Sequence, residues 1–204
     1  PDGRWATAWT DATEIKGSDP LDGYQDITVL DLVGVTSTQL AVGYRPSALT
    51  YDSKSDTLFA ITDDGVTVIA LGDNAEVLRH VVLAAGPNDT PNTRDVSITS
   101  DGKLALVRRD SVAGVGVFSM ADGGSVDVVL PGPVTDLDLA PDGSVAVAVI
   151  REAGQVAVID MGSIFLEPTS FKLVAVSDVV VGSVALPSKS PLAFLYTNAL
   201  PVSA

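Results

Sequence analysis

The sequence predicts an all-β protein, and three observations lead to that fold class. Apolar residues alternate at a period of two in short runs such as Val145–Val149 and Val156–Asp160, which is typical of β-strands. Turn-forming pairs such as Asp101-Gly102 and Asp142-Gly143 separate these runs at hairpin spacing. These two pairs lie 41 residues apart, within the roughly 40–50 residues of a propeller blade. We therefore expect a β-propeller of four-stranded antiparallel blades.

The first blade is expected to be incomplete. Pro1-Asp2-Gly3 matches the end of a turn that follows a first strand, so the sequence would start inside a blade. Its second, third and fourth strands are predicted at Arg4–Trp9, Ile27–Leu32 and Gln39–Val42.

Three complete blades and one partial blade are predicted to follow, with their strands in the same order. The first complete blade has strands at Ser47–Tyr51, Thr57–Thr62, Val66–Leu71 and Val77–Leu83. The next has Asp95–Thr99, Lys103–Arg108, Val115–Met120 and Ser125–Leu130. The third has Val134–Ala140, Ser144–Ile150, Gln155–Met161 and Thr169–Val176. The last, partial blade has Ser183–Leu186 and Leu192–Thr197.

The predicted organisation is one propeller segment, residues 1–204, of about four and a half blades. Partial blades span 1–43 and 178–204, and complete blades span 44–86, 87–132 and 133–177. The two partial blades would both supply a second strand and therefore do not complete each other. We expect the segment to belong to a larger ring of about seven blades, because an open stack leaves apolar faces uncovered.

Four segments resemble the YVTN-type repeat of bacterial, lactonase-like β-propellers. Val156–Asp160 matches its V-x-V-I-D motif and Val42–Pro46 its V-G-x-x-P motif. Leu139–Gly143 matches the motif in which an apolar residue precedes x-x-D-G, and Leu195–Asn198 is similar to Y-V-T-N. The resemblance covers nearly the whole chain and implies a fold more than an activity, because no catalytic motif of the family matches residue by residue.

Composition excludes several classes of function. Of the 204 residues, 46% are hydrophobic, and 26 acidic residues outnumber 12 basic ones, giving a net charge of −14. This charge disfavours nucleic acids and anionic membranes, and no apolar run approaches the roughly 18 residues of a membrane span. Cys is absent and His80 is the single histidine, which excludes disulfides and Cys/His metal sites. His80 is expected at an outer rim, without a nucleophile in a recognisable motif.

Aligned polar residues at the starts of the first strands are the candidate ligand-binding set: Ser47, Asp95, Asp136 and Ser183. First strands line the centre of a propeller, so this set is expected to surround one mouth of the channel. Asp95 and Asp136 would offer oxygen ligands to a divalent cation such as calcium, with Ser47 or Ser183 and water completing the shell. The alternative is that each Asp caps its own turn. No other cofactor is expected.

Two further groups are candidates for contacts with a partner. Arg108, Arg109 and Arg151 are expected at matching ends of neighbouring second strands, where they would bind a carboxylate or form surface ion pairs. Insertions at residues 11–26 and 86–94 interrupt the repeat, and such loops either carry function or have drifted neutrally. The first insertion holds the remaining partner-binding candidates, which are Asp19, Asp22, Tyr24 and Asp26. Asp63-Asp64-Gly65 is expected to be a solvated hairpin turn.

These observations favour a non-enzymatic scaffold in an extracytoplasmic bacterial protein, whether periplasmic, cell-surface or secreted. It would bind a protein or a glycan through loops on a rigid ring, and its partner would be another protein or the remaining blades on another chain. Two alternatives stay open. One is a lactonase-like hydrolase with a cation at the channel mouth, and the other is a structural part of a larger envelope assembly.

Overall fold

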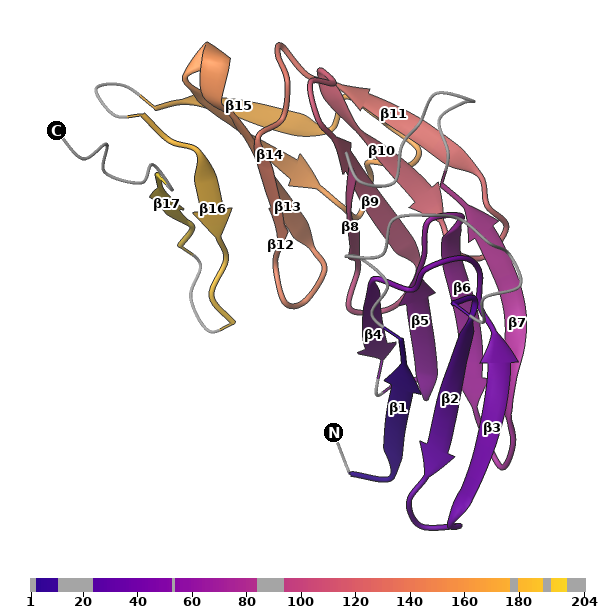
Figure 1. Ribbon diagram of the computed structural model, residues 1–204. Helices are drawn as coiled ribbons and strands as arrows, with labels where there is room; N and C mark the ends of the chain where they lie inside the picture. Colours follow the sequence, from indigo (N-terminus) through magenta and orange to yellow (C-terminus); the bar gives the residue numbers. More distant parts are fainter. Residues whose placement is uncertain are drawn as a thin grey trace, which may run out of the picture. The chain divides into compact units, whose positions relative to one another are not determined.

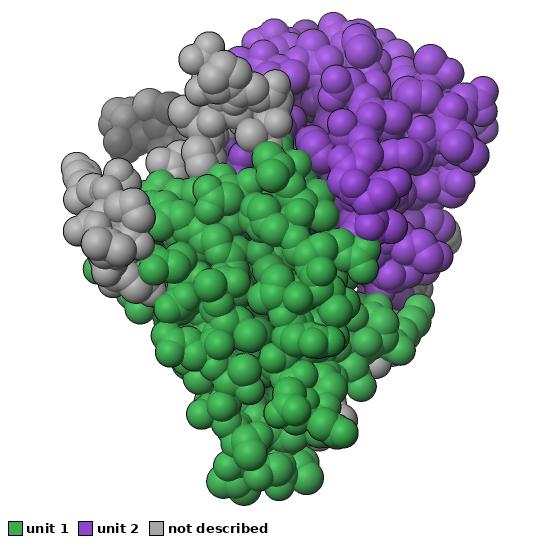
Figure 2. Space-filling view, turned by 90° about the vertical axis from the view of Figure 1, so that its right-hand side faces the viewer, with its two compact units in different colours: residues 1–92 green, residues 93–204 purple. Residues whose placement is uncertain are grey.

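The computed structural model describes residues 3–10, 24–52, 54–83, 94–176, 180–188 and 192–197. The chain divides into two compact units, residues 1–92 and 93–204, which are coloured separately in Figure 2. Within the described residues, antiparallel sheets account for nearly all the regular structure (Figure 1).

The described residues of the first unit form two sheets. A three-stranded sheet has the order β1-β2-β3, with β1 at Trp5–Trp9, β2 at Asp26–Asp31 and β3 at Thr36–Ala41. A four-stranded sheet has the order β4-β5-β6-β7, with strands at Ala48–Asp52, Thr57–Ile61, Gly65–Leu71 and Ala75–Val82. Both sheets are simple meanders, so each strand pairs with its neighbour in the sequence.

Three sheets are formed by the part of the second unit that the structure describes. One has the order β8-β9-β10-β11, with strands at Arg94–Ile98, Leu104–Arg109, Gly114–Ser119 and Ser125–Val129. The next has the order β12-β13-β14-β15, with strands at Asp136–Leu139, Val145–Ile150, Gln155–Asp160 and Phe171–Ala175. The last pairs β16 (Ser183–Ala185) with β17 (Phe194–Tyr196). A short 3₁₀ helix, η2, at Arg151–Ala153 separates β13 from β14.

The alternating pattern of β13 explains how blades stack within the second unit. Ala146, Ala148 and Ile150 belong to an apolar cluster with residues of β9 and β10. Val147 and Val149 lie on the opposite face and pack with Val184 of β16 and with Val181. Because successive side chains of a strand point to opposite faces, one strand joins the core on both sides of its sheet. All five of these β13 side chains are buried.

The first unit stacks its two sheets in the same way. Ile27 and Val29 of β2 form an apolar cluster with Leu58 and Ala60 of β5 and with Ile69 of β6. All of them are buried. Sheets of four antiparallel strands that meet face to face through apolar side chains are the blades of a partial β-propeller. The fold class predicted from the sequence is confirmed.

Every predicted strand is present, with ends that shift by a few residues. The largest difference is at β3, which begins at Thr36 rather than Gln39. Arg151 was expected at the end of a second strand and instead begins η2, because the chain turns through Gly154 at φ +60° before β14. No helix in the described part of the chain is long and apolar enough to span a membrane.

Candidate functional site

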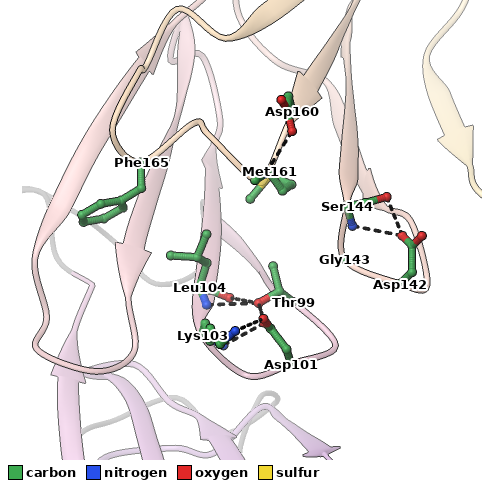
Figure 3. Close-up of a pocket in the computed structure, with 11 residues that line it drawn as sticks. Thr99, Asp101, Lys103, Leu104, Asp142, Gly143, Ser144, Asp160, Met161 and Phe165 are labelled. Atoms are coloured by element: carbon green, nitrogen blue, oxygen red, sulfur yellow. Dashed lines mark hydrogen bonds and ion pairs between the residues drawn. The ribbon is translucent and has the colours of Figure 1, made fainter.

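Three segments of the second unit line one hollow with a volume of about 380 Å³ (Figure 3). They are the turn between β8 and β9, the turn between β12 and β13, and the segment that follows β14. The lining residues are Thr99, Asp101, Lys103, Leu104, Asp142, Gly143, Ser144, Asp160, Met161, Gly162 and Phe165. Three carboxylates and one ammonium give this surface an acidic character.

Asp101 is held by its own turn. Its Oδ1 accepts hydrogen bonds from Thr99 Oγ1 at 2.8 Å and from the Lys103 backbone N–H at 3.1 Å, and its Oδ2 lies 3.0 Å from Lys103 Nζ. Partial burial opposes the charged form of this carboxyl. The hydrogen bonds from Thr99 and Lys103 outweigh that effect and hold the pKa of Asp101 below its usual value. The group is therefore ionised and fixed in place at neutral pH.

Asp142 is fixed in the matching turn of the next blade. Its Oδ1 accepts hydrogen bonds from the Ser144 N–H at 3.0 Å and from Ser144 Oγ at 2.7 Å, and these bonds lower the pKa of its carboxyl. The neighbouring Gly143 has φ +73°, and a Cβ there would lie 3.3 Å from Ser100 Oγ. The turn geometry and the close approach of the two turns both favour glycine at this position.

Asp160 and two apolar side chains complete the hollow. Asp160 Oδ1 accepts the Gly162 N–H at 3.0 Å, and Oδ2 accepts the Ser163 hydroxyl at 3.0 Å. Met161 is buried and Phe165 is half-buried, so an aromatic ring and a thioether share the lining with the carboxylates. Each acidic group is oriented by donors of its own turn, which gives a polar surface organised before any ligand binds.

Asp95, Arg108 and Asp110 form a network of charged side chains that also contacts the segment before β12, in the next blade. Arg108 Nε lies 2.9 Å from Asp95 Oδ2, and its Nη1 lies 2.7 Å from Asp110 Oδ1. The same Nη1 donates to the carbonyl of Val134, just before β12, at 3.3 Å. The Arg108 side chain is 13% exposed. Burial opposes its charge, but the two carboxylates outweigh burial and raise the pKa of the guanidinium.

Asp136 contacts β16, the first strand of the following blade, and does not share the partner of Asp95. Its Oδ2 accepts the backbone N–H of Val184 in β16 at 2.9 Å, and its Oδ1 accepts the N–H of Leu137 at 3.0 Å. Ser183, immediately before Val184, is buried. Thus Asp136 and the Ser183 strand are brought together, while Asp95 is held by Arg108.

The other described candidates from the sequence are not among the residues that line the hollow. Ser47 Oγ donates to the carbonyl of Ile61 at 3.4 Å in the first unit. In that unit Asp26 Oδ2 accepts the Gln39 amide at 3.0 Å, and the Tyr24 carbonyl accepts the Arg45 N–H at 3.1 Å. Arg109, like Arg108, lies in β9, whereas Arg151 is exposed in η2. Asp19 and Asp22 lie outside the described residues.

The turn at Asp63 is less solvated than expected from the sequence. Asp63 Oδ2 lies 2.5 Å from Arg45 Nη2, and both side chains are largely buried. Asp64 Oδ2 accepts the Tyr44 N–H at 2.7 Å. The predicted hairpin turn is present and Asp64 is exposed, whereas Asp63 is largely buried against Arg45. The two carboxylates join the segment before β4 to the β5–β6 turn.

The sequence does not single out the residues that line the hollow, because an Asp-Gly turn is typical of any hairpin. One signal was available. The Asp-Gly turns at Asp101 and Asp142 occupy the same place in successive blades, and equivalent turns of adjacent blades lie at the same end. Among the described residues, no group of three or more His, Asp or Glu side chains is arranged to hold a metal ion.

The chain is similar to known proteins over part of its sequence and in its fold. The sequence model of a family described as SdiA-regulated matches residues 35–120. A solved structure titled "Dihydro-heme d1 dehydrogenase NirN in complex with DHE" is similar over 95% of this chain and 40% of its own, with 17% identity and a TM-score of 0.58. The hydrazine synthase of Kuenenia stuttgartiensis is similar over 75% of this chain and 44% of its own, with 18% identity and a TM-score of 0.47.

The chain therefore spans less than half the length of either of these two structures. No curated protein matches the sequence. At this identity the similarity to the NirN structure shows the propeller fold alone.

Proposed function

We propose that this chain is a non-enzymatic β-propeller interaction module of an extracytoplasmic bacterial protein, and that it binds a protein partner through the hollow of its second unit. The observation that supports this proposal most directly is the convergence of three turns whose carboxylates are each oriented by their own hydrogen bonds. Rigid turns displayed on a stable scaffold are the usual place for binding. A preorganised surface of this kind loses little conformational entropy on binding.

The chemistry of the hollow favours a basic group of the partner. Asp101, Asp142 and Asp160 line it together with the single cation Lys103, and the whole chain carries a net charge of −14. Phe165 offers a ring against which an arginine side chain can stack. A guanidinium would find both carboxylate acceptors and an aromatic surface there.

The contacts of Asp95 and Asp136 favour the proposed interaction module over a hydrolase that depends on a bound cation. That alternative needs both carboxylates to ligate one ion. Arg108 holds Asp95, and the N–H groups of Leu137 and Val184 occupy Asp136. A cation would have to displace these donors, which costs hydrogen bonds to charged groups. Lactone hydrolysis that is lost in Asp95→Asn would favour the hydrolase.

Calorimetric titration with an arginine–glycine hexapeptide tests the proposal. Asp142→Asn should weaken binding by about tenfold, because one charge-assisted contact is lost. The matched control is Asp122→Asn, which alters an Asp that caps the β10–β11 turn at Gly124 N, 3.1 Å away, and does not line the hollow. Equal losses in both variants would indicate non-specific attraction to an acidic protein and would refute the proposed site.

A further inference from the structure

Asp31 and Asp160 occupy the same place in two blades, one in each unit. Each is the last residue of the strand next to the outermost one, β2 and β14 respectively. The N–H of the residue after Asp31 donates to the carbonyl of Arg4 at 2.7 Å, and the N–H of the residue after Asp160 donates to the carbonyl of Ser144 at 3.0 Å. Each aspartate also accepts the N–H of the second residue after it. Arg4 and Ser144 are therefore equivalent positions as well.

In the blade of β1–β3, Arg4 places a guanidinium against the carboxylate. Arg4 Nη2 lies 2.9 Å from Asp31 Oδ2, and its Nε lies 3.3 Å from the same oxygen. The guanidinium carbon also lies 4.6 Å from the centre of the Trp5 ring. A carboxylate and an aromatic ring thus contact one guanidinium, which is a planar group that suits both.

In the blade of β12–β15, a short uncharged side chain stands where Arg4 stands. The Ser144 hydroxyl donates to Asp142 Oδ1 at 2.7 Å, so it is bound within its own turn. Asp160 is exposed and accepts the N–H of Gly162 and the hydroxyl of Ser163. Both of these donors are uncharged, and each carboxylate oxygen can accept a further hydrogen bond.

The two remaining complete blades have no carboxylate at this place. The same backbone contact and strand register assign Asp56 and Ala70 to the two positions in the blade of β4–β7. They assign Lys103 and Ser119 in the blade of β8–β11. Of these four blades, only that of Asp160 combines an aspartate at the end of this strand with an uncharged residue at the position of Arg4.

We propose that the hollow receives an arginine side chain of a protein partner, whose guanidinium pairs with Asp160 as Arg4 pairs with Asp31. Ser144 keeps this place open. Asp160, Ser144 and the ring of Phe165 line the same hollow of about 380 Å³, which therefore offers the carboxylate and the aromatic surface that Arg4 contacts (Figure 3). This assignment rests on the proposed binding function and specifies the group that is bound.

The geometry of the Arg4 pair favours arginine over lysine in the partner. Two nitrogens of Arg4 approach one carboxylate oxygen side by side. An ammonium has a single nitrogen and cannot reproduce this fork. In calorimetric titration, the arginine–glycine hexapeptide should bind the parent chain about tenfold more tightly than a lysine–glycine hexapeptide. Equal affinities for the two peptides overturn the assignment, and this comparison needs no variant.

Ser144→Arg tests whether the chain's own guanidinium can fill the hollow. It should weaken binding of the arginine–glycine hexapeptide by about tenfold or more. Ser144→Gln removes the same hydroxyl and adds an uncharged side chain, so it should weaken binding much less. Val129→Arg adds the same charge at an exposed position of β11 that does not line the hollow, and it should change the affinity little.

These variants separate the assignment from the proposed function on which it rests. If Ser144→Arg weakens binding no more than Ser144→Gln does, the assignment is overturned. The binding function survives that result if Asp142→Asn still weakens binding. A parent chain that binds neither peptide overturns both.

NMR of the arginine Nε–H groups is a test that needs no peptide. Ser144→Arg should add one Nε–H signal that exchanges slowly with water, because a hydrogen-bonded N–H is protected. Adding Asp160→Asn should return that signal to fast exchange, while the protected Nε–H of Arg4 reports that the chain is folded. Fast exchange of the added signal in Ser144→Arg, or slow exchange that persists in the double variant, overturns the assignment.

Discussion

The carboxylate of Asp138 in β12 accepts the backbone N–H of Leu186, just beyond β16, at 2.7 Å. Asp136, two residues earlier on the same strand, accepts the N–H of Val184 at 2.9 Å. Alternate residues of β12 thus accept hydrogen bonds from alternate N–H groups along β16 and the residue just after it. Side chains of one blade supply acceptors along the inner edge of its neighbour, which fastens a two-stranded sheet that has few contacts of its own.

Removing either carboxylate should loosen that sheet. Asp138→Ala leaves the Leu186 N–H without its acceptor and should lower the free energy of unfolding by about 1–3 kcal/mol. Amide hydrogen exchange should show faster exchange at Leu186 and Val184 than in the parent chain. Asp127→Ala, on the exposed face of β11, is the control and should change neither. Unchanged exchange at Leu186 would show that the bond contributes nothing to the sheet.

Asp31 should make stability depend on pH. The hydrogen bond from Arg4, followed by those from Gly34 and Val33, lowers the pKa of its carboxyl from 3.8 to about 2. The charged form is therefore favoured in the folded state. Its contribution is complete above the unfolded pKa and is lost as the pH falls through the folded one.

The test compares the melting temperatures of Asp31→Asn and the parent chain. The variant should melt lower at pH 7, and the difference should shrink as the pH falls from 3.8 towards 2. Glu76→Gln, an exposed change on β7, is the control and should show no such convergence. A difference that stays constant over this range would mean that Asp31 acts through packing.

Thr67 should fix the tautomer of His80. Its hydroxyl donates to the carbonyl of Val42, and Oγ1 lies 2.8 Å from His80 Nδ1. A hydroxyl has one proton, so His80 must donate from Nδ1. Nitrogen NMR of the imidazole should show a proton on Nδ1 in the parent chain and a loss of this preference in Thr67→Val. Thr67→Ser, which retains the hydroxyl, should preserve it.

The same variant should reduce stability. Thr67 is buried, and Thr67→Val leaves the Val42 carbonyl without this donor. We expect a loss of about 1–3 kcal/mol in the free energy of unfolding, measured in urea. A variant as stable as the parent chain would show that the contact between the end of β3 and β6 does not need this hydroxyl.

Alanine variants of two glycines can distinguish the cost of backbone strain within a turn from the cost of contact between two turns. Gly143 and Gly123 have nearly the same conformation, at φ +73° and φ +76°. A Cβ at Gly143 would lie 3.3 Å from Ser100 Oγ, whereas nothing lies within 4 Å of one at Gly123. Both alanine variants should lose about 1 kcal/mol from the backbone conformation. Gly143→Ala should lower the free energy of unfolding by more than Gly123→Ala does. Equal losses in the two variants would show that the turns at Gly143 and Ser100 are not in close contact.

The sequence predicts much of the fold because the repeat is carried by local signals. The alternation in β13 and the Asp-Gly turns are visible within a few residues, so strand positions follow directly. The ends are less certain, because tertiary contacts decide them. β3 extends back to Thr36 since the β2–β3 pairing continues to Asp31, opposite Thr36.

The candidate site depends on neighbours that no local pattern reveals. Asp95 and Asp136 occupy the same place in the repeat, yet Arg108 binds the first and β16 binds the second. The difference arises because β9 supplies an arginine opposite Asp95, whereas Val149 lies opposite Asp136 in β13. Equivalent positions in a repeat share a backbone geometry but not their partners.

The most direct test of the proposed binding function is an NMR titration of the labelled chain with the arginine–glycine hexapeptide. The proposal predicts saturable shifts of amide signals in residues 99–104, 142–144 and 160–165, with much smaller shifts when glutamate replaces arginine in the peptide. Asp142→Asn should reduce the shifts at these three segments together. Shifts scattered over acidic residues of both units, or saturation centred on other segments, would contradict a binding site in the hollow.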